Sequence, residues 1–560
     1  MIEKEGKHDE RKFKKWMALM LSTTMLAACM TGCGSEEKEA ASKNEPAKEE
    51  AAVENTEVAE EASGYQTTYG SKQFDDVTIK VELWDRSNAP EGSTITDNKW
   101  VDYVNQEMGK VGIKVEFVPV PRSDEMSKMQ TMVASQTAPD ITITYSYATA
   151  EDYFKQGGIW NLAPFIDGED QAKNIKEYIG KDVLDIARTP DNELYGIVAR
   201  RATTAACNMY LRKDWLDKLG LAIPTTPDEL YHVIDQMVNN NPDGMKEVIG
   251  LEPWMFYNLR IAFSQVTEDP LMSRVASGAD YITEYADPGS KEYYRFLNKA
   301  YNNGLMHKEY FALNEDQFKS YIVTGALACF EANVNFAADP VRGNLVKTLQ
   351  DNVPGAELIS LPALKNPNDG KQYSSGYCPG GLIAFCPLTA DEETVEACMT
   401  YLDWMCTKEG GFAIYHGFEG EHFEYNEDGV PIAKDVAYNA KDKDWLRQDL
   451  FLTGNSGYFA TAEEFNASQA AEAPGFEEFV TQSFENSLSG TVINAEAYSS
   501  PSTSELTTDL GLVRDEYKVS CVTCPEDEFE ATYAEYMSEL EKAGIQKIID
   551  ERIEYFSSME

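Results

Sequence analysis

The sequence is short of basic residues, of histidine and of recognisable catalytic motifs. Lysine and arginine together number 49 against 95 aspartate and glutamate residues, and only 5 histidines are present, so the formal net charge is −46. This charge, with no basic patch, argues against nucleic acid or an anionic lipid surface as a partner. The HExxH, GxSxG and Walker motifs are all absent. The sequence therefore singles out no catalytic residue.

The ten cysteines do not form the pattern of a disulfide scaffold. Two stand near the N-terminus, and most of the others are scattered through largely apolar segments. The motif Cys521-Val-Thr-Cys524 has no second CxxC to complete a zinc site. We expect these two cysteines to form either a small surface disulfide or two inert thiols, and the sequence does not decide between them.

The N-terminus has the pattern of a bacterial export signal. A basic cluster at 11–15 precedes the apolar run Trp16–Ala28. That run is shorter than the roughly 20 residues a membrane-spanning helix needs, but it is typical of a signal-peptide core. Residues 1–28 are therefore predicted to be a signal peptide.

Two cysteines follow this run in contexts that resemble the bacterial lipobox. Cys29 follows Leu-Ala-Ala, whereas Cys33 precedes Gly-Ser, so both remain candidates for lipidation. An ordinary secretory signal is the alternative. The stretch to residue 74 is rich in Glu, Ala and Lys and poor in large apolar residues, which predicts a disordered acidic tether. Residues 29–74 would thus anchor the chain by lipid to the extracellular face of the cell membrane.

The remainder, about 490 residues, exceeds one hydrophobic core and suggests two domains. Periodicity predicts strands at 77–84, 113–119 and 139–144, separated by helices at about 96–110 and 124–135. This order indicates a parallel sheet, and ligands of such sheets lie beyond the carboxyl ends of the strands. Trp84, Tyr145 and Tyr147 stand at those ends.

Further helices are predicted along the chain. Thr226-Pro227-Asp228-Glu229 has Thr as N-cap, Pro at the first helical position and Glu as the third residue, which predicts a capping box and a helix to about residue 238. Later helices are expected at about 291–303, 391–408 and 527–542.

Several segments match a known family in order along the chain. They are Ala138–Ile141, Tyr153–Phe165, Asn192–Ile197, Tyr210–Thr226, Leu297–Met306 and Gly417–Tyr425. On these segments the chain resembles the family 1 extracellular solute-binding lipoproteins of bacterial ABC importers. Within this family, the chain most resembles the long branch associated with polysaccharide-derived oligosaccharides, which includes alginate-binding proteins. Val198 departs from the family pattern, in which proline is usual.

The resemblance implies an α/β fold of the periplasmic-binding-protein-like type II class, with two discontinuous lobes joined by a hinge. The family architecture maps the first lobe to 75–198 plus 326–388 and the second to 199–325 plus 389–560. A ligand would lie in the cleft and be enclosed as the lobes close.

The same branch often carries an EF-hand-like calcium loop after the capped helix. Here the segment Asn241-Pro-Asp-Gly-Met-Lys-Glu-Val-Ile249 lacks the alternating oxygen ligands and is too short for six-fold coordination. We therefore expect no calcium at this position, and the sequence gives no other metal or cofactor site.

A sugar site needs hydrogen-bonding groups for hydroxyls and aromatic faces for C–H patches. Residues of both kinds follow the first-lobe strands, the hinge entry and the apolar strand at 326–330. The predicted ligand-binding residues are Trp84, Tyr145, Tyr147, Arg200, Arg201, Trp254, Tyr257, Glu331, Asn333, Asn335 and Tyr377. Core packing or a surface ion pair is the alternative for each of them. The two arginines favour uronic acids among the possible sugars.

The resemblance implies a non-enzymatic receptor that delivers an oligosaccharide to the transmembrane subunits of an ABC permease. A monomer is expected. Three alternatives stay open: a peptide-binding receptor of the same architecture, a sensor partner of a signalling receptor, and a surface glycoside hydrolase. The hydrolase would need two carboxylates facing each other across a cleft.

Overall fold

The computed structural model describes residues 72–559 apart from 203–204, 253, 341–342, 455–456 and 460. The predicted signal peptide, Cys29, Cys33 and nearly all of the predicted tether lie outside the described residues. Within the part that is described, no helix is long and apolar enough to cross a membrane.

The first sheet places four strands in one direction. β1 (Val77–Asp85) pairs in parallel with β2 (Ile113–Pro121), and Val81 forms a parallel bridge to Ile141, just before β3 (Thr142–Thr144). β10 (Gly380–Phe385) lies antiparallel between β3 and β4 (Ile197–Arg200), so β4 runs the same way as β3. The predicted parallel β-α-β-α-β unit is confirmed, with α2 (Lys99–Gly109) and α3 (Glu125–Ala134) as its helices.

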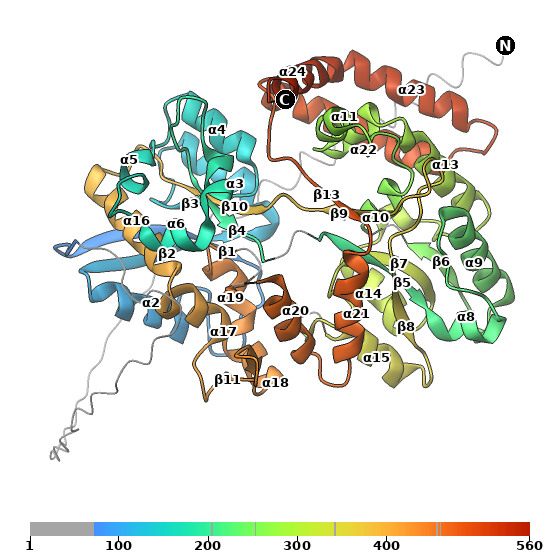
Figure 1. Ribbon diagram of the computed structural model, residues 1–560, viewed down its shortest axis with the longest axis horizontal. Coiled ribbons are helices and arrows are strands. Elements are labelled where there is room, and N and C mark those ends of the chain that lie inside the picture. The colour runs from blue at the N-terminus through green and yellow to red at the C-terminus, as the bar shows by residue number, and fades with distance from the viewer. Residues whose placement is uncertain are drawn as a thin grey trace, which may run out of the picture. The chain divides into compact units, whose positions relative to one another are not determined.

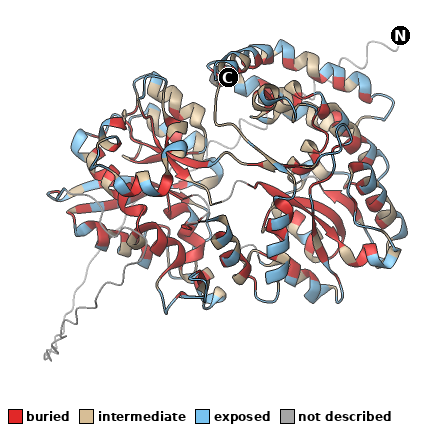
Figure 2. Ribbon diagram, in the orientation of Figure 1, coloured by how far each residue is buried: buried red, intermediate tan, exposed pale blue. Residues whose placement is uncertain are grey.

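The second sheet has four strands in the order β6-β7-β5-β8. β6 (Ile249–Glu252) is parallel to β7 (Leu327–Asn333), and β5 (Cys207–Arg212) is antiparallel to both β7 and β8 (Leu358–Leu361). Most of these strand residues are buried, as the red strands of Figure 2 show. α8 (Lys213–Leu219) packs against β8, and α9 (Pro227–Asn240) packs against β6 and β7.

The remaining helices and strands form two groups, one for each lobe, and each group is split in the sequence (Figure 1). Those that follow the strands of the first sheet are α4 (Tyr147–Lys155), α5 (Ala163–Ile166), α6 (Lys173–Ile179), α7 (Lys181–Leu184), α16 (Glu392–Met405), α17 (Ala413–His416), β11 (Phe423–Tyr425), β12 (Pro431–Ala433), α18 (Val436–Asn439) and α19 (Trp445–Leu450). The others are α10 (Tyr257–Ile261), α11 (Pro270–Ala276), α12 (Asp280–Ala286), α13 (Gly289–Asn302), α14 (Glu315–Val323), α15 (Leu345–Asn352), β9 (Tyr373–Gly376), α20 (Ala462–Ala471), α21 (Glu477–Ser487), β13 (Thr491–Asn494), α22 (Thr503–Thr523), α23 (Phe529–Lys542) and α24 (Ile545–Ser557).

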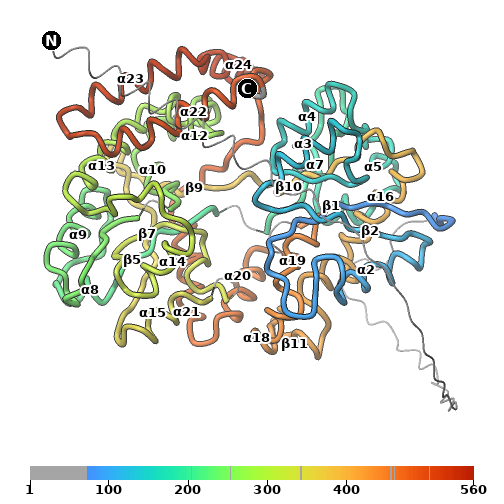
Figure 3. Tube along the Cα trace, turned by 180° about the vertical axis from the view of Figure 1, so that it is seen from behind, coloured from blue at the N-terminus to red at the C-terminus, as the bar shows by residue number. Residues whose placement is uncertain are grey.

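The C-terminal helices pack on the lobe of the second sheet. α22 contacts α13, and α24 contacts α11 and α12, as Figure 3 shows from behind. Cys521 is buried in α22 and Cys524 caps its end, and both are free thiols. A small surface disulfide and two thiols were the expected alternatives for this motif, and the structure shows two thiols.

Strand pairing differs from the expected division of the lobes. The segment 326–388 was predicted to lie in the first lobe, but β7 and β8 hydrogen-bond to β5, and only β10 joins the first sheet. The segment after 389 was assigned to the second lobe, yet α16 and α19 pack against β1. The sequence of an apolar strand does not indicate which sheet the strand joins. The points at which the chain passes from one lobe to the other therefore could not be predicted.

The start of α9 is close to the predicted capping box. The Thr226 side chain accepts a hydrogen bond from the Glu229 N–H at 3.2 Å, as expected of an N-cap. The Glu229 carboxylate, however, accepts from the N–H and the hydroxyl of Thr225, both at 2.8 Å. The return bond is therefore made one residue earlier than in a capping box.

The loop after α9 is tied to the sheet by a buried arginine. Arg212 is fully buried and donates to both oxygens of Asp214 at 2.8 Å and to Asp243 at 2.9 Å. Burial alone would raise the pKa of Asp214, but the bonds and charge of Arg212 lower it. Trp215 and Lys218 also donate to Asp243. Since these donors occupy the Asp243 carboxylate, the loop does not fit a calcium ligand set.

We expect Arg212→Leu to lower the free energy of unfolding by about 3–5 kcal/mol, because it leaves the buried Asp214 without its main partner and removes one of three donors to Asp243. Urea denaturation of the intact protein measures this. Lys218→Ala is the matched control, because its side chain is 45% exposed while contacting the same two aspartates, and it should cost less than about 1 kcal/mol. Equal losses in the two variants would contradict the assignment.

Candidate ligand-binding cavity

A cavity of about 1150 Å³ lies at the carboxyl ends of the first-sheet strands and is lined by residues of both lobes. Arg86, Arg122, Tyr145 and Arg201 come just after β1, β2, β3 and β4 respectively. Because these strands run in one direction, the residues that follow them meet at one edge of the sheet. The second lobe contributes side chains from α14, from the end of β7 and from the segment after β9, among them Lys319, Asn333 and Tyr377.

Most of the cationic side chains in the cavity are paired with acids. Arg86 forms two hydrogen bonds, of 2.6 and 2.9 Å, with Asp449. Arg122 lies 3.3 Å from Glu125, and Lys319 lies 2.7 Å from Glu315. Arg447 contacts Asp444 and Glu472 at 3.1 and 3.2 Å, with its guanidinium over the Tyr415 ring. These pairs hold the side chains in place and neutralise their charge.

Arg201 differs from the other cations because no carboxylate of a described residue lies within 4.0 Å of it. Its Nε donates to the Gly380 carbonyl at 2.9 Å, and its guanidinium lies 4.5 Å from the centroid of the Tyr377 ring. The Tyr377 hydroxyl accepts from Asn333 at 2.9 Å, and burial raises the pKa of Tyr377 to about 12. Arg201, Tyr377 and Asn333 thus form a fixed, polar and aromatic wall.

Tyr145 and Asn335 also line the cavity. The Tyr145 ring lies 5.5 Å from the Trp84 ring and keeps 38% of its surface exposed. Asn335 donates to Gln469 of α20 at 2.7 Å. Of the predicted residues, Tyr145, Arg201, Asn333, Asn335 and Tyr377 are therefore brought together at one cavity.

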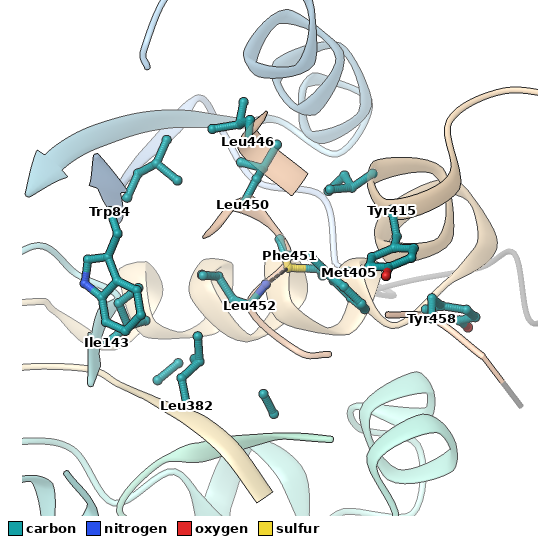
Figure 4. Packing of buried hydrophobic residues seen from close by; sticks show 14 of the residues in the cluster. Trp84, Ile143, Leu382, Met405, Tyr415, Leu446, Leu450, Phe451, Leu452 and Tyr458 are labelled. Atoms are coloured by element: carbon teal, nitrogen blue, oxygen red, sulfur yellow. Dashed lines mark hydrogen bonds between the residues drawn. The ribbon is translucent and has the colours of Figure 1, made fainter. Parts of the chain in front are cut away.

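Trp84 and Tyr147 pack inside the first lobe instead. Trp84 is 1% exposed, donates from Nε1 to Glu82 at 2.9 Å, and lies under the guanidinium of Arg122. Figure 4 shows its ring beside Ile143, on the core side of the sheet. The Tyr147 hydroxyl donates to the Gly381 carbonyl. The prediction that these two rings face the cleft is not supported, because neither residue lines the cavity and Trp84 is almost wholly buried.

Arg200 and Glu331 do not line this cavity either. Arg200 donates to the Tyr178 carbonyl at 3.2 Å and lies over the Tyr178 ring. Glu331 is fully buried and accepts from the Cys207 thiol and from the N–H groups of Asn258 and Leu259. Burial raises the pKa of Glu331 to about 7, against the lowering effect of these bonds. Its role is to bind the start of α10 to the second sheet.

Trp254 and Tyr257 line a different cavity, within the second lobe. Trp254 stacks on Phe318 with ring centroids 5.1 Å apart. The two cavities share no lining residue. The predicted aromatic segment is therefore placed at a separate site.

The structure also reveals lining residues that the sequence did not indicate. Arg86 and Arg122 could have been found, because each comes one residue after a strand of the predicted parallel sheet. The predicted strand-end residues stand at the ends of the first and third strands only. Lys319, Tyr415, Arg447 and Gln469 lie on helices far along the chain, and no local pattern connects them to the edge of the sheet.

Three side chains elsewhere have the residue types of a metal site. Glu421, His422 and Asp442 bring their ligand atoms within 4.8 Å of one another. The Lys99 ammonium, however, lies 3.1 Å from Glu421 and 2.7 Å from Asp442. His422 Nδ1 accepts from the Phe418 N–H, so its Nε2 donates to Asp442 at 2.9 Å. Lysine thus takes the position that a cation would need.

The comparison with known proteins agrees with this geometry. Residues 99–421, more than half of the chain, match the family model described as bacterial extracellular solute-binding protein. The chain belongs to this family. The two-lobed α/β fold predicted from the sequence is confirmed.

Two curated relatives come from Bacillus subtilis (strain 168). Lipoprotein LipO is 25% identical over 439 residues, which are 75% of each chain. The polygalacturonan/rhamnogalacturonan-binding protein YtcQ is 24% identical over 343 residues, 59% of this chain and 64% of that one. Among solved structures, an HMO-binding, ABC-transporter-associated solute-binding protein from Bifidobacterium longum infantis has a TM-score of 0.61 at 15% identity. The two structures align over 87% of this chain and 99% of that chain.

Proposed function

We propose that this solute-binding protein captures an oligosaccharide in the cavity between its lobes and delivers it to an ABC permease, acting as a monomer without turning the sugar over. The observation that carries the proposal is the lining of the cavity. Fixed hydrogen-bonding groups and aromatic rings from both lobes face a space large enough for several sugar units. A ligand that contacts both lobes favours their closed arrangement.

The family and the relatives' names support this choice of ligand. YtcQ is named for polygalacturonan and rhamnogalacturonan binding. Tyrosine and phenylalanine rings line the cavity, including Tyr377, Tyr415 and Phe484, and such rings pack on the C–H faces of sugars. No observation on the described residues favours a peptide over a sugar, and no pair of carboxylates is singled out for hydrolysis.

A uronic-acid-containing oligosaccharide fits the charges best. The paired arginines and lysine of the cavity are already neutralised, whereas Arg201 has no carboxylate partner among the described residues. A guanidinium in this state binds a carboxylate through charge-assisted hydrogen bonds. We therefore infer that Arg201 would hold the carboxylate of a uronic acid unit.

Thermal-shift screening of the intact protein against oligosaccharide and peptide libraries tests the function directly. A saccharide at 100 times its Kd should stabilise the fold by about 2.7 kcal/mol. Chromatography of the incubated ligand should then recover it unchanged. Shortened products would contradict a receptor, and shifts with peptides alone would overturn the choice of sugar.

Replacement of Arg201 should separate acidic from neutral ligands. In Arg201→Gln, we expect the affinity for trigalacturonic acid to fall by about 10- to 100-fold, because a hydrogen bond to a charged group contributes about 1.5–3 kcal/mol. The methyl ester of the same trisaccharide should lose much less. Arg200→Gln is the matched control, since Arg200 does not line the cavity. Isothermal titration calorimetry gives each Kd, and equal losses for acid and ester would reject the uronic acid assignment.

The anchor is proposed from the sequence and from the relative named lipoprotein LipO. We infer that Cys29 or Cys33 carries the lipid that holds the protein at the extracellular face of the membrane. Intact mass spectrometry of the protein from bacterial membranes should show a diacylglyceryl-modified N-terminus at one of these two cysteines. A mature chain that begins elsewhere and carries no lipid would contradict the anchor.

A further inference from the structure

The second lobe contains a cavity of its own, of about 380 Å³. Its walls come from the end of β6, from α10, α13 and α22, and from the segment at 310–313. It is more than twice the roughly 150 Å³ that accommodates benzene in an engineered protein cavity. It shares no lining residue with the cavity between the lobes, but the two walls include the consecutive residues Leu313 and Asn314.

An unpartnered carboxyl group lines this cavity. Glu252, the last residue of β6, is 2% exposed, and its Oε2 is buried with no hydrogen-bond partner. Its side chain forms no ion pair with a described residue. Burial raises the pKa of Glu252 to about 8. Nearly all buried polar groups of native proteins are bonded, so an unpartnered oxygen on a residue that lines a cavity calls for an explanation.

The other charged side chains in the wall form ion pairs, although Nε of Arg514 has no hydrogen-bond partner. Arg260 and Arg514 each contact Asp280 at 2.7 Å, and Arg514 lies 3.6 Å from Glu284. Lys518 is paired with Asp515 at 2.5 Å. Opposite charges within this network offset one another, which leaves Glu252 as the acid without a counterpart.

Aromatic rings make up much of the remaining wall. Trp254, Tyr257, Tyr293 and Tyr310 line the cavity, and Phe311, which is 52% exposed, lies beside Tyr310 with ring centroids 5.6 Å apart. The faces of such rings attract cations and pack well on hydrocarbon. The wall thus combines these rings with one acid, Glu252, that has no ion-pair partner among the described residues.

We propose that this cavity binds a small molecule that carries a primary ammonium group. The ammonium would donate its N–H groups to the Glu252 carboxylate, and the carbon body would lie against the rings. The bound cation would supply the positive charge that the site lacks. The buried carboxylate could then ionise, and it would accept hydrogen bonds from the ammonium. This inference does not rest on the oligosaccharide function, because the site lies within one lobe.

Calorimetry of the intact protein at pH 7 with cyclohexylamine and with cyclohexanol tests the proposal. The two probes have the same ring and differ mainly in the ammonium. We expect one site per chain, with the amine bound at least tenfold more tightly than the alcohol. In Glu252→Gln this preference should fall at least tenfold, because the amide has nearly the same shape but cannot ionise. The thermal unfolding midpoint of the ligand-free variant should match that of the unmodified protein, which shows that the variant is folded.

A second pair of variants makes the test independent of any folding defect in Glu252→Gln. Phe311→Ala removes an exposed ring from the wall, and it should weaken amine binding several-fold. Leu388→Ala removes an equally exposed apolar side chain, 50% exposed, from the other lobe, and it should change nothing. Equal binding of amine and alcohol, or amine binding unaffected by Glu252→Gln and by Phe311→Ala, would overturn the proposal.

Discussion

Parallel hydrogen bonding between β1 and β2, together with the bridge from Val81 to Ile141, brings the carboxyl ends of the strands to one edge of the first sheet. β10 extends this order, because its antiparallel pairing on both sides makes β4 run with β3. Every first-lobe loop that lines the large cavity starts at that edge. The position of the ligand site is therefore a consequence of strand direction rather than of any one side chain.

The two cavities differ in the sign of the charged group that has no ion-pair partner. In the cavity between the lobes, most arginines are held by acids, and one, Arg201, is left to face the space. In the cavity of the second lobe, the arginines again form ion pairs with acids, whereas Glu252 has no ion pair with a described residue. Burial makes an unmatched charge costly. Each of the two proposed ligands would bring a charge that pairs with one of these groups.

Much of the local structure could be predicted because periodicity and capping act over a few residues. The strands 77–84 and 113–119 and the helix after Thr226 were found in this way. The site was only partly predictable. The rule for parallel sheets identified the right edge, but at each strand end a side chain faces either the core or the space, and Trp84 and Arg86 differ in just this respect. Arg447 and Lys319 reach the cavity through tertiary packing, which leaves no trace in local sequence.

The pairing of β10 between β3 and β4 also governs the order in which the chain can fold. The ribosome makes β3 and β4 first, and then all of β5 to β9, before the strand that joins them exists. The first lobe therefore stays open until the elements of the second sheet have been made, which places distant contacts on the path to its native state. Until β10 is made, β3 and β4 keep unpaired edges, and such edges are the parts of a sheet most prone to pair wrongly.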